Sequence, residues 1–161
     1  MDFYEGTPAR RRILEAPYSE MPDKANHVDP ELPIDDSDGG SDTGEIHPHK
    51  AWSRQHPALH IDQENDVISD YGQEIFNFLR MKDIDSLLIL GVHTNMCILN
   101  RSFAIRQMVG LGFRVALVRD LTDAMYNPAM RPYVSHDDGT RLVVGYIEKF
   151  WCPTVSSQDF P

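Results

Sequence analysis

The sequence predicts an α/β domain with a parallel sheet, and three features of residues 84–120 carry this prediction. The run 87–90 is continuously apolar and is closed by Gly91, as in a strand that is covered on both faces. Apolar side chains then recur at helical spacing over 98–109, and a second apolar run follows at 115–118. Strand, helix and strand in this order predict a right-handed βαβ unit.

Four further segments complete the predicted order of elements. Short stretches at 58–61 and 152–156 are typical of strands, which would join a mostly parallel sheet. The segments 71–81 and 140–150 carry apolar residues at helical spacing, and Asp70 stands where a side chain could cap the first of these helices.

Residues 1–57 differ in composition from the rest of the chain. Prolines recur, the run 35–42 is acidic, and apolar periodicity is almost absent. We therefore interpret residues 1–57 as an irregular, acidic, Pro-rich arm or cap, and residues 58–161 as the folded domain. The basic run 10–12 is typical of a solvated helix face, with a phosphate-contacting patch as the alternative.

Charge and cysteine content exclude several classes of partner. The 161 residues include 15 basic and 25 acidic side chains, and a net charge of -10 disfavours binding to nucleic acid or to an anionic membrane. The sequence contains no run of 18 apolar residues, so no membrane span is predicted. Two cysteines make no disulfide framework, so we expect a reducing, cytoplasmic location, with export open if the natural start lies upstream.

Cys97 stands where such a fold would carry out chemistry. It follows the first strong strand and opens the predicted helix, a position at which parallel sheets bind ligands. Backbone N–H groups at a helix start can stabilise a thiolate and an oxyanion. A lone cysteine at this position is, by itself, more often a small buried apolar residue.

The residues around Cys97 form a recognisable pattern. The segment Gly91-Val92-His93-Thr94-Asn95-Met96-Cys97 follows a hydrophobic strand, and RVALVRDLTDA occupies the next strand at 114–124. This pattern resembles the isochorismatase-like cysteine hydrolase family, which includes nicotinamidases and related amidohydrolases. The resemblance extends over about 70–123 and says little about residues 1–57.

The resemblance implies a fold and a reaction. The fold would be a three-layer α/β/α, Rossmann-like domain, and Cys97 would attack an amide or related bond of a small molecule to give a thioester intermediate. Backbone amides of the turn at Val92, His93 and Met96 would bind the oxyanion, and a cis peptide would fall at Val92–His93. Some members cleave vinyl ethers, so the motif leaves the bond open.

Other residues are candidates for the pocket. They follow the carboxyl ends of the two strong strands and comprise Asn95, Asp120, Asp123 and Tyr126. An aspartate that ends a strand is more often a loop cap than a ligand-binding group. His136 is a possible acid or base, or else belongs to a helix start, and Cys152 is expected to be a buried thiol.

The sequence also departs from the family. The family uses a lysine before the helix at 71–81, but no lysine lies between Lys50 and Lys82, and the strand that ends in the catalytic aspartate is not found. We therefore expect the first strands to be missing and the chain to be the C-terminal portion of a longer hydrolase. An incomplete sheet favours homo-oligomers. The alternative is a catalytically inactive member or fragment that serves ligand binding or assembly.

Two features raise the question of a metal ion. Some nicotinamidases hold zinc through one aspartate and two histidines, and this chain has four loosely spaced histidines, His47, His49, His56 and His60. The acidic segment 62–70 partly follows the ligand spacing of a calcium loop, but Val67 stands where such a loop needs glycine. We predict no metal or cofactor, with zinc and calcium as alternatives.

Overall fold

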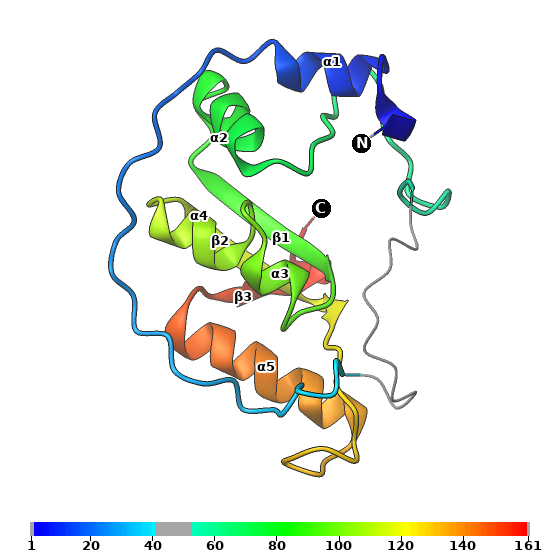
Figure 1. Ribbon diagram of the computed structural model, residues 1–161, viewed down its shortest axis with the longest axis vertical. Coiled ribbons are helices and arrows are strands. Elements are labelled where there is room, and N and C mark those ends of the chain that lie inside the picture. Colours follow the sequence, from blue (N-terminus) through cyan, green and yellow to red (C-terminus); the bar gives the residue numbers. More distant parts are fainter. Residues whose placement is uncertain (1, 41–52, 161) are drawn as a thin grey trace. The chain divides into compact units, whose positions relative to one another are not determined.

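The computed structural model describes residues 2–40 and 53–160, and the chain divides into two compact units (Figure 1). Unit 1 consists of Met1–Met21 and His47–Asp85, and unit 2 of Pro22–Ile46 and Ser86–Pro161. Residues 1–57, interpreted from the sequence as one arm, therefore contribute to both units.

Unit 1 contains the 3₁₀-helix η1 (Asp2–Tyr4) and the helices α1 (Pro8–Leu14) and α2 (Gly72–Met81). Thr7 caps α1 by accepting a hydrogen bond from the Arg10 N–H, and Pro8 occupies the first turn, where its missing N–H costs nothing. The Arg10 guanidinium bonds to the Glu74 carboxylate of α2, and this hydrogen bond is the largest cause that lowers the pKa of Glu74.

The basic run at 10–12 has partners within the chain. Arg10 pairs with Glu74, and Arg12 donates to the backbone carbonyl oxygens of Gln63 and Asp66. Neither a phosphate patch nor a purely solvated helix face describes these two side chains. Local sequence patterns do not indicate these partners, because they lie more than 50 residues away along the chain.

The segment before α2 differs from its prediction. The strand predicted at 58–61 is wrong, since residues 53–60 form bends, turns and coil with exposed side chains. The Asp70 cap is also wrong, because Tyr71 is the N-cap of α2 and makes no capping hydrogen bond with its side chain. The helix predicted at 71–81 is confirmed as α2.

Unit 2 contains a parallel sheet with the strand order β1-β2-β3, which confirms the α/β class. Its strands are β1 (Ser86–Val92), β2 (Arg114–Asp123) and β3 (Thr154–Val155). The register between β1 and β2 shifts between Ile89 and Gly91, so that Gly91 pairs with Thr122. This irregularity brings the end of β2 beside the turn that follows β1.

Three helices connect these strands: α3 (Cys97–Asn100), α4 (Ile105–Gly110) and α5 (His136–Phe150). The single helix predicted over 98–109 is wrong, because Arg101 adopts an extended backbone and separates α3 from α4. The helix predicted at 140–150 begins earlier, since Ser135 accepts a hydrogen bond from the Asp138 N–H and caps α5.

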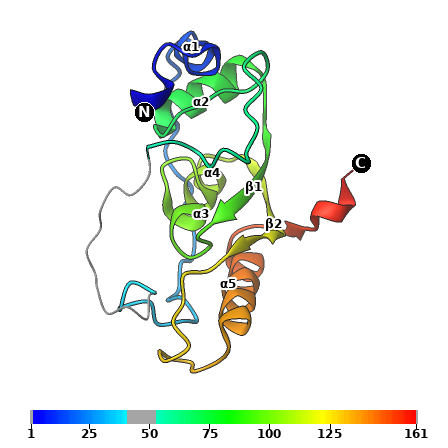
Figure 2. The ribbon, with the colours of Figure 1, turned by 90° about the vertical axis from the view of Figure 1, so that its right-hand side faces the viewer.

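One face of β1 is exposed, in contrast to the predicted cover on both faces. Leu88, Leu90 and Val92 are 50%, 51% and 58% exposed. Both crossover connections step along the sheet in the same direction, and right-handed connections then place their helices on the same face. Figure 2 shows α3 and α4 on one side of β1. The second face therefore carries no helix among the described residues of unit 2.

The core of unit 2 lies between the sheet and these helices. Its fully buried side chains come from every layer and include Leu99, Ile105, Met108, Leu117, Val143 and Ile147. Residues 22–36 cross the unit as an irregular strap. Tyr146 of α5 donates to Asp29 at 2.5 Å, and Arg106 of α4 bonds to the same carboxylate.

A Leu→Ala substitution should lower the free energy of unfolding by different amounts on the two faces of the sheet. Leu117→Ala removes a side chain with 0% exposure and should lower the free energy of unfolding by about 2–5 kcal/mol. Leu88→Ala, on the exposed face, should cost less than about 1 kcal/mol. Urea unfolding followed by circular dichroism measures both variants. Equal losses would show that the Leu88 face is covered in solution.

Candidate functional site

The turn between β1 and α3 holds Cys97 at the carboxyl end of the parallel sheet. The peptide bond between Val92 and His93 is cis, as the family resemblance implies. The His93 carbonyl oxygen accepts hydrogen bonds from the N–H groups of Met96 and Ile98, at 3.1 and 3.2 Å. These bonds close the turn so that Cys97 becomes the first residue of α3.

Cys97 is a free, half-buried thiol at an open hollow of about 450 Å³. The hollow is lined by acidic, basic, amide and apolar side chains from two stretches of the chain, namely Leu32, Asp36, Asn95, Met96, Cys97, Asn100 and Arg101. The alternative of a cysteine packed away among aliphatic side chains does not describe Cys97. Cys97 thus lines a hollow that opens to solvent.

The backbone amides of this turn differ in whether they are already bonded. The Met96 N–H donates within the turn, and the Thr94 N–H donates to the Asp123 carbonyl oxygen at 2.9 Å. Within residues 2–40 and 53–160, the N–H groups of His93, Asn95 and Cys97 donate to no other residue. Among the predicted oxyanion residues, His93 thus keeps a free amide, Met96 does not, and Val92 belongs to β1.

Asn95 is 2% exposed and joins the turn to two other segments. Its Nδ2 donates to Asp36 Oδ2 at 2.9 Å and to the Met125 carbonyl oxygen at 3.1 Å. Its Oδ1 accepts from the Met125 N–H at 2.9 Å. Both side-chain N–H donors and the side-chain oxygen are therefore used, so the Asn95 side chain supports the turn and has no hydrogen left for a ligand.

Asp36 is a site residue that the sequence analysis missed. It lies in the acidic run 35–42, which the sequence assigns to an irregular arm or cap, yet its carboxylate accepts from Asn95 and lines the hollow of Cys97. Among the described residues that line this hollow, it is the only carboxylate. The one sequence signal that could have indicated this position is the apolar residue Ile34, two residues before Asp36, which is buried in the structure. Only the folded chain brings positions 36 and 97 together.

A second cluster lies where β2 ends and α5 begins, and it consists of Asp123, Tyr126 and His136. His136 Nε2 lies 2.9 Å from Asp123 Oδ1, and His136 Nδ1 lies 3.0 Å from the Tyr126 carbonyl oxygen. The Tyr126 hydroxyl donates to the Met130 carbonyl oxygen, and its ring is buried. These residues do not line the hollow of Cys97 but hold the loop between β2 and α5.

Asp120 and Cys152 lie outside both clusters. The Asp120 carboxylate accepts hydrogen bonds from the Ser157 hydroxyl at 2.6 Å and from the Ser157 N–H at 2.8 Å, and these bonds lower the pKa of Asp120. Asp120 therefore ties β2 to η2 (Ser157–Asp159). Burial raises the pKa of the Cys152 thiol to about 11, in agreement with the expected buried thiol.

No group of three or more potential metal ligands occurs in the part of the chain that the structure describes. His47 and His49 lie outside the described residues, and His56 and His60 stand on the exposed segment 53–60. The Asp62 carboxylate accepts from the Glu64 N–H and from Asn65 Nδ2, at 2.8 and 2.6 Å. The Asp62 carboxylate thus bonds to groups of the segment 62–66 itself, which forms a turn.

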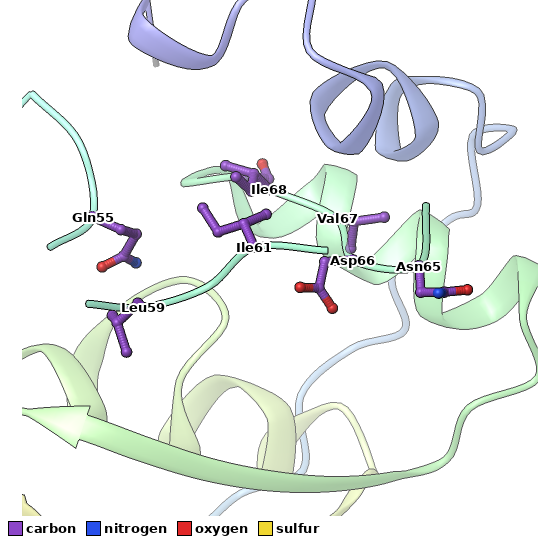
Figure 3. Close-up of a pocket in the computed structure, with 8 residues that line it drawn as sticks. Gln55, Leu59, Ile61, Asn65, Asp66, Val67 and Ile68 are labelled. Atoms are coloured by element: carbon purple, nitrogen blue, oxygen red, sulfur yellow. The ribbon is translucent and has the colours of Figure 1, made fainter. Parts of the chain in front are cut away.

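A separate hollow of about 460 Å³ lies within unit 1 (Figure 3). It is lined by one continuous segment and by Gln55, with the residues Leu59, Ile61, Asn65, Asp66, Val67, Ile68 and Ser69. In Figure 3 the side chains of Ile61 and Ile68 lie beside each other. The described residues of this lining include no thiol, imidazole or cationic group, so the hollow of Cys97 is the stronger candidate for chemistry.

Two results bear on the class of protein. Every helix within residues 2–40 and 53–160 is too short or too polar to cross a lipid bilayer. Comparisons of the chain with protein-family models, with curated proteins and with solved structures find no match.

Proposed function

We propose that this protein is a cysteine hydrolase that resembles the isochorismatase-like family, with its three-layer fold, and that Cys97 is the nucleophile. The observation that carries the proposal is the half-buried Cys97 thiol at an open hollow, next to backbone N–H groups without partners among the described residues. The substrate would be a small molecule with an amide or related bond. Such chemistry needs a reduced thiol, and a reducing, cytoplasmic location would preserve it.

The proposed reaction proceeds by covalent catalysis. The Cys97 sulfur attacks the carbonyl carbon, a C–S bond forms, and the C=O electron pair moves onto the oxygen. The N–H groups of His93, Asn95 and Cys97 are the available donors for this oxyanion. Collapse expels the amine, which takes up a proton, and leaves a thioester. Water then hydrolyses the thioester to a carboxylic acid and the free thiol.

Asp36 is the proposed proton acceptor for this reaction. A thiol must lose its proton before it attacks, and a carboxylate in the same hollow can take that proton directly or through one water molecule. Asn95 holds the Asp36 carboxylate by a charge-assisted hydrogen bond of 2.9 Å, which limits its rotation. No lysine stands among the described residues that line the hollow, and Arg101 is the only cationic side chain among them.

The first test is thiol-dependent turnover. The 161-residue chain should hydrolyse nicotinamide or another member of a panel of small amides, with ammonia or amine release as the measurement. Cys97→Ser should lower kcat by at least about 10³-fold, because the hydroxyl is a far weaker nucleophile without a strong base. Cys152→Ser is the matched control and should retain activity. Saturable binding of an amide without turnover would instead support the non-catalytic alternative.

The second test concerns Asp36. Asp36→Asn should lower kcat by about 10²–10⁴-fold, since the amide accepts no proton, while the near-isosteric side chain fills the same volume. Asp35→Asn changes the neighbouring carboxylate, which accepts from the Ser37 N–H and does not line the hollow, and should have little effect. Equal activity in Asp36→Asn and the unmodified chain would exclude Asp36 as the base.

A further inference from the structure

The imidazole of His136 lies between two groups that can only accept hydrogen bonds. Its Nδ1 is 3.0 Å from the Tyr126 carbonyl oxygen, and its Nε2 is 2.9 and 3.1 Å from the two oxygens of Asp123. A carbonyl oxygen has no hydrogen to donate, and neither has a carboxylate. A proton on each ring nitrogen would satisfy both contacts, so the arrangement fits the imidazolium better than the neutral ring.

Thr140 supplies a second donor to the Asp123 carboxyl group. The Ala124 N–H donates to Thr140 Oγ1 at 3.1 Å, which leaves the Thr140 hydroxyl hydrogen free to donate. That hydroxyl lies 2.9 Å from Asp123 Oδ1 and donates to it. Asp123 Oδ1 therefore accepts from Thr140, and a charged carboxylate is the form that accepts from both Thr140 and His136.

The groups that His136 bonds are connected to the turn of Cys97. The Asp123 carbonyl oxygen accepts from the Thr94 N–H. Met125, the residue before Tyr126, exchanges two hydrogen bonds with the Asn95 side chain. The Thr94 and Thr122 hydroxyls are 2.7 Å apart and add a third link. The start of α5 is thus connected through Asp123 at the end of β2 and through Met125 of the following loop to the turn that carries the thiol.

We propose that His136 is a protonation-dependent clasp: as the imidazolium it ties the start of α5 to the end of β2 and to Tyr126, and through Met125 it positions Asn95 and the turn of Cys97. The clasp itself stands on the hydrogen bonds above. Its consequence for catalysis rests on the proposed hydrolase function. His136 acts through other residues, so it is a positioning residue and does not line the hollow.

The charged neighbours favour the proposed form. The hydrogen bond to the Tyr126 carbonyl raises the pKa of His136 most, burial opposes this, and Asp123 of β2 and Asp137 of α5 raise it further. A histidine whose pKa is raised on folding contributes stability that is complete below its unfolded pKa of about 6.5. That contribution is lost as the pH rises through the folded pKa. The loop should therefore loosen in mildly alkaline solution.

Hydrogen exchange and NMR test the clasp without any substrate. The Met125 N–H should be better protected near pH 5.5 than near pH 8, after correction for intrinsic exchange, by about tenfold for each unit that separates the folded and unfolded pKa of His136. His136→Gln should remove this pH dependence. His56→Gln is the matched control, because His56 stands on an exposed segment of unit 1 and should leave the dependence unchanged.

An NMR titration of the unmodified chain keeps the test decisive if His136→Gln fails to fold. The ring ¹⁵N shifts of His136 should show both nitrogens protonated near pH 5.5 and a pKa above about 6.5, and Asp123→Asn should lower that pKa. A His136 pKa at or below the ordinary value, or unchanged protection of Met125 across the titration, would overturn the proposal. Absence of amide hydrolysis would contradict only the proposed function, since neither readout uses turnover.

Discussion

The buried amide of Asn95 is the constraint on which the candidate site depends. An amide that is 2% exposed must satisfy its hydrogen bonds inside the protein, because an unpaired buried polar group costs about 1–3 kcal/mol. Asn95 does so by bonding to Met125 and to Asp36, from segments 30 and 59 residues away. The turn, the loop after β2 and the acidic segment are therefore held as a single arrangement around Cys97.

The parallel sheet explains why these segments meet. β1 and β2 run in the same direction, so their carboxyl ends lie at the same edge, and the shift in register beside Gly91 brings Thr122 opposite the end of β1. Thr94 of the cysteine turn then lies within hydrogen-bonding distance of β2. Its hydroxyl contacts the Thr122 hydroxyl, and its N–H donates to the Asp123 carbonyl oxygen. A rigid edge of this kind can hold a thiol beside unused amides, as nucleophilic catalysis requires.

The exposed face of β1 illustrates how a local pattern can mislead. Leu88 and Leu90 belong to a continuous apolar run, which normally indicates a strand buried on both faces. Cover for a strand is supplied by distant parts of a fold, and the two connections of unit 2 place their helices on one face only. The break between α3 and α4 is a second case, since apolar spacing alone did not indicate that Arg101 would be extended.

Local chemistry by itself determined β1, β2, α2 and the placement of Cys97 at a strand-to-helix turn, because apolar periodicity and turn residues act over a few neighbouring positions. Tertiary structure decided which polar groups share the site. In the folded chain Asp36 lines the same hollow as Cys97, whereas Asp120 accepts a hydrogen bond from Ser157. His136 lies between Asp123 and Tyr126. These pairings depend on contacts between distant segments, and no local periodicity encodes which donor will meet which acceptor.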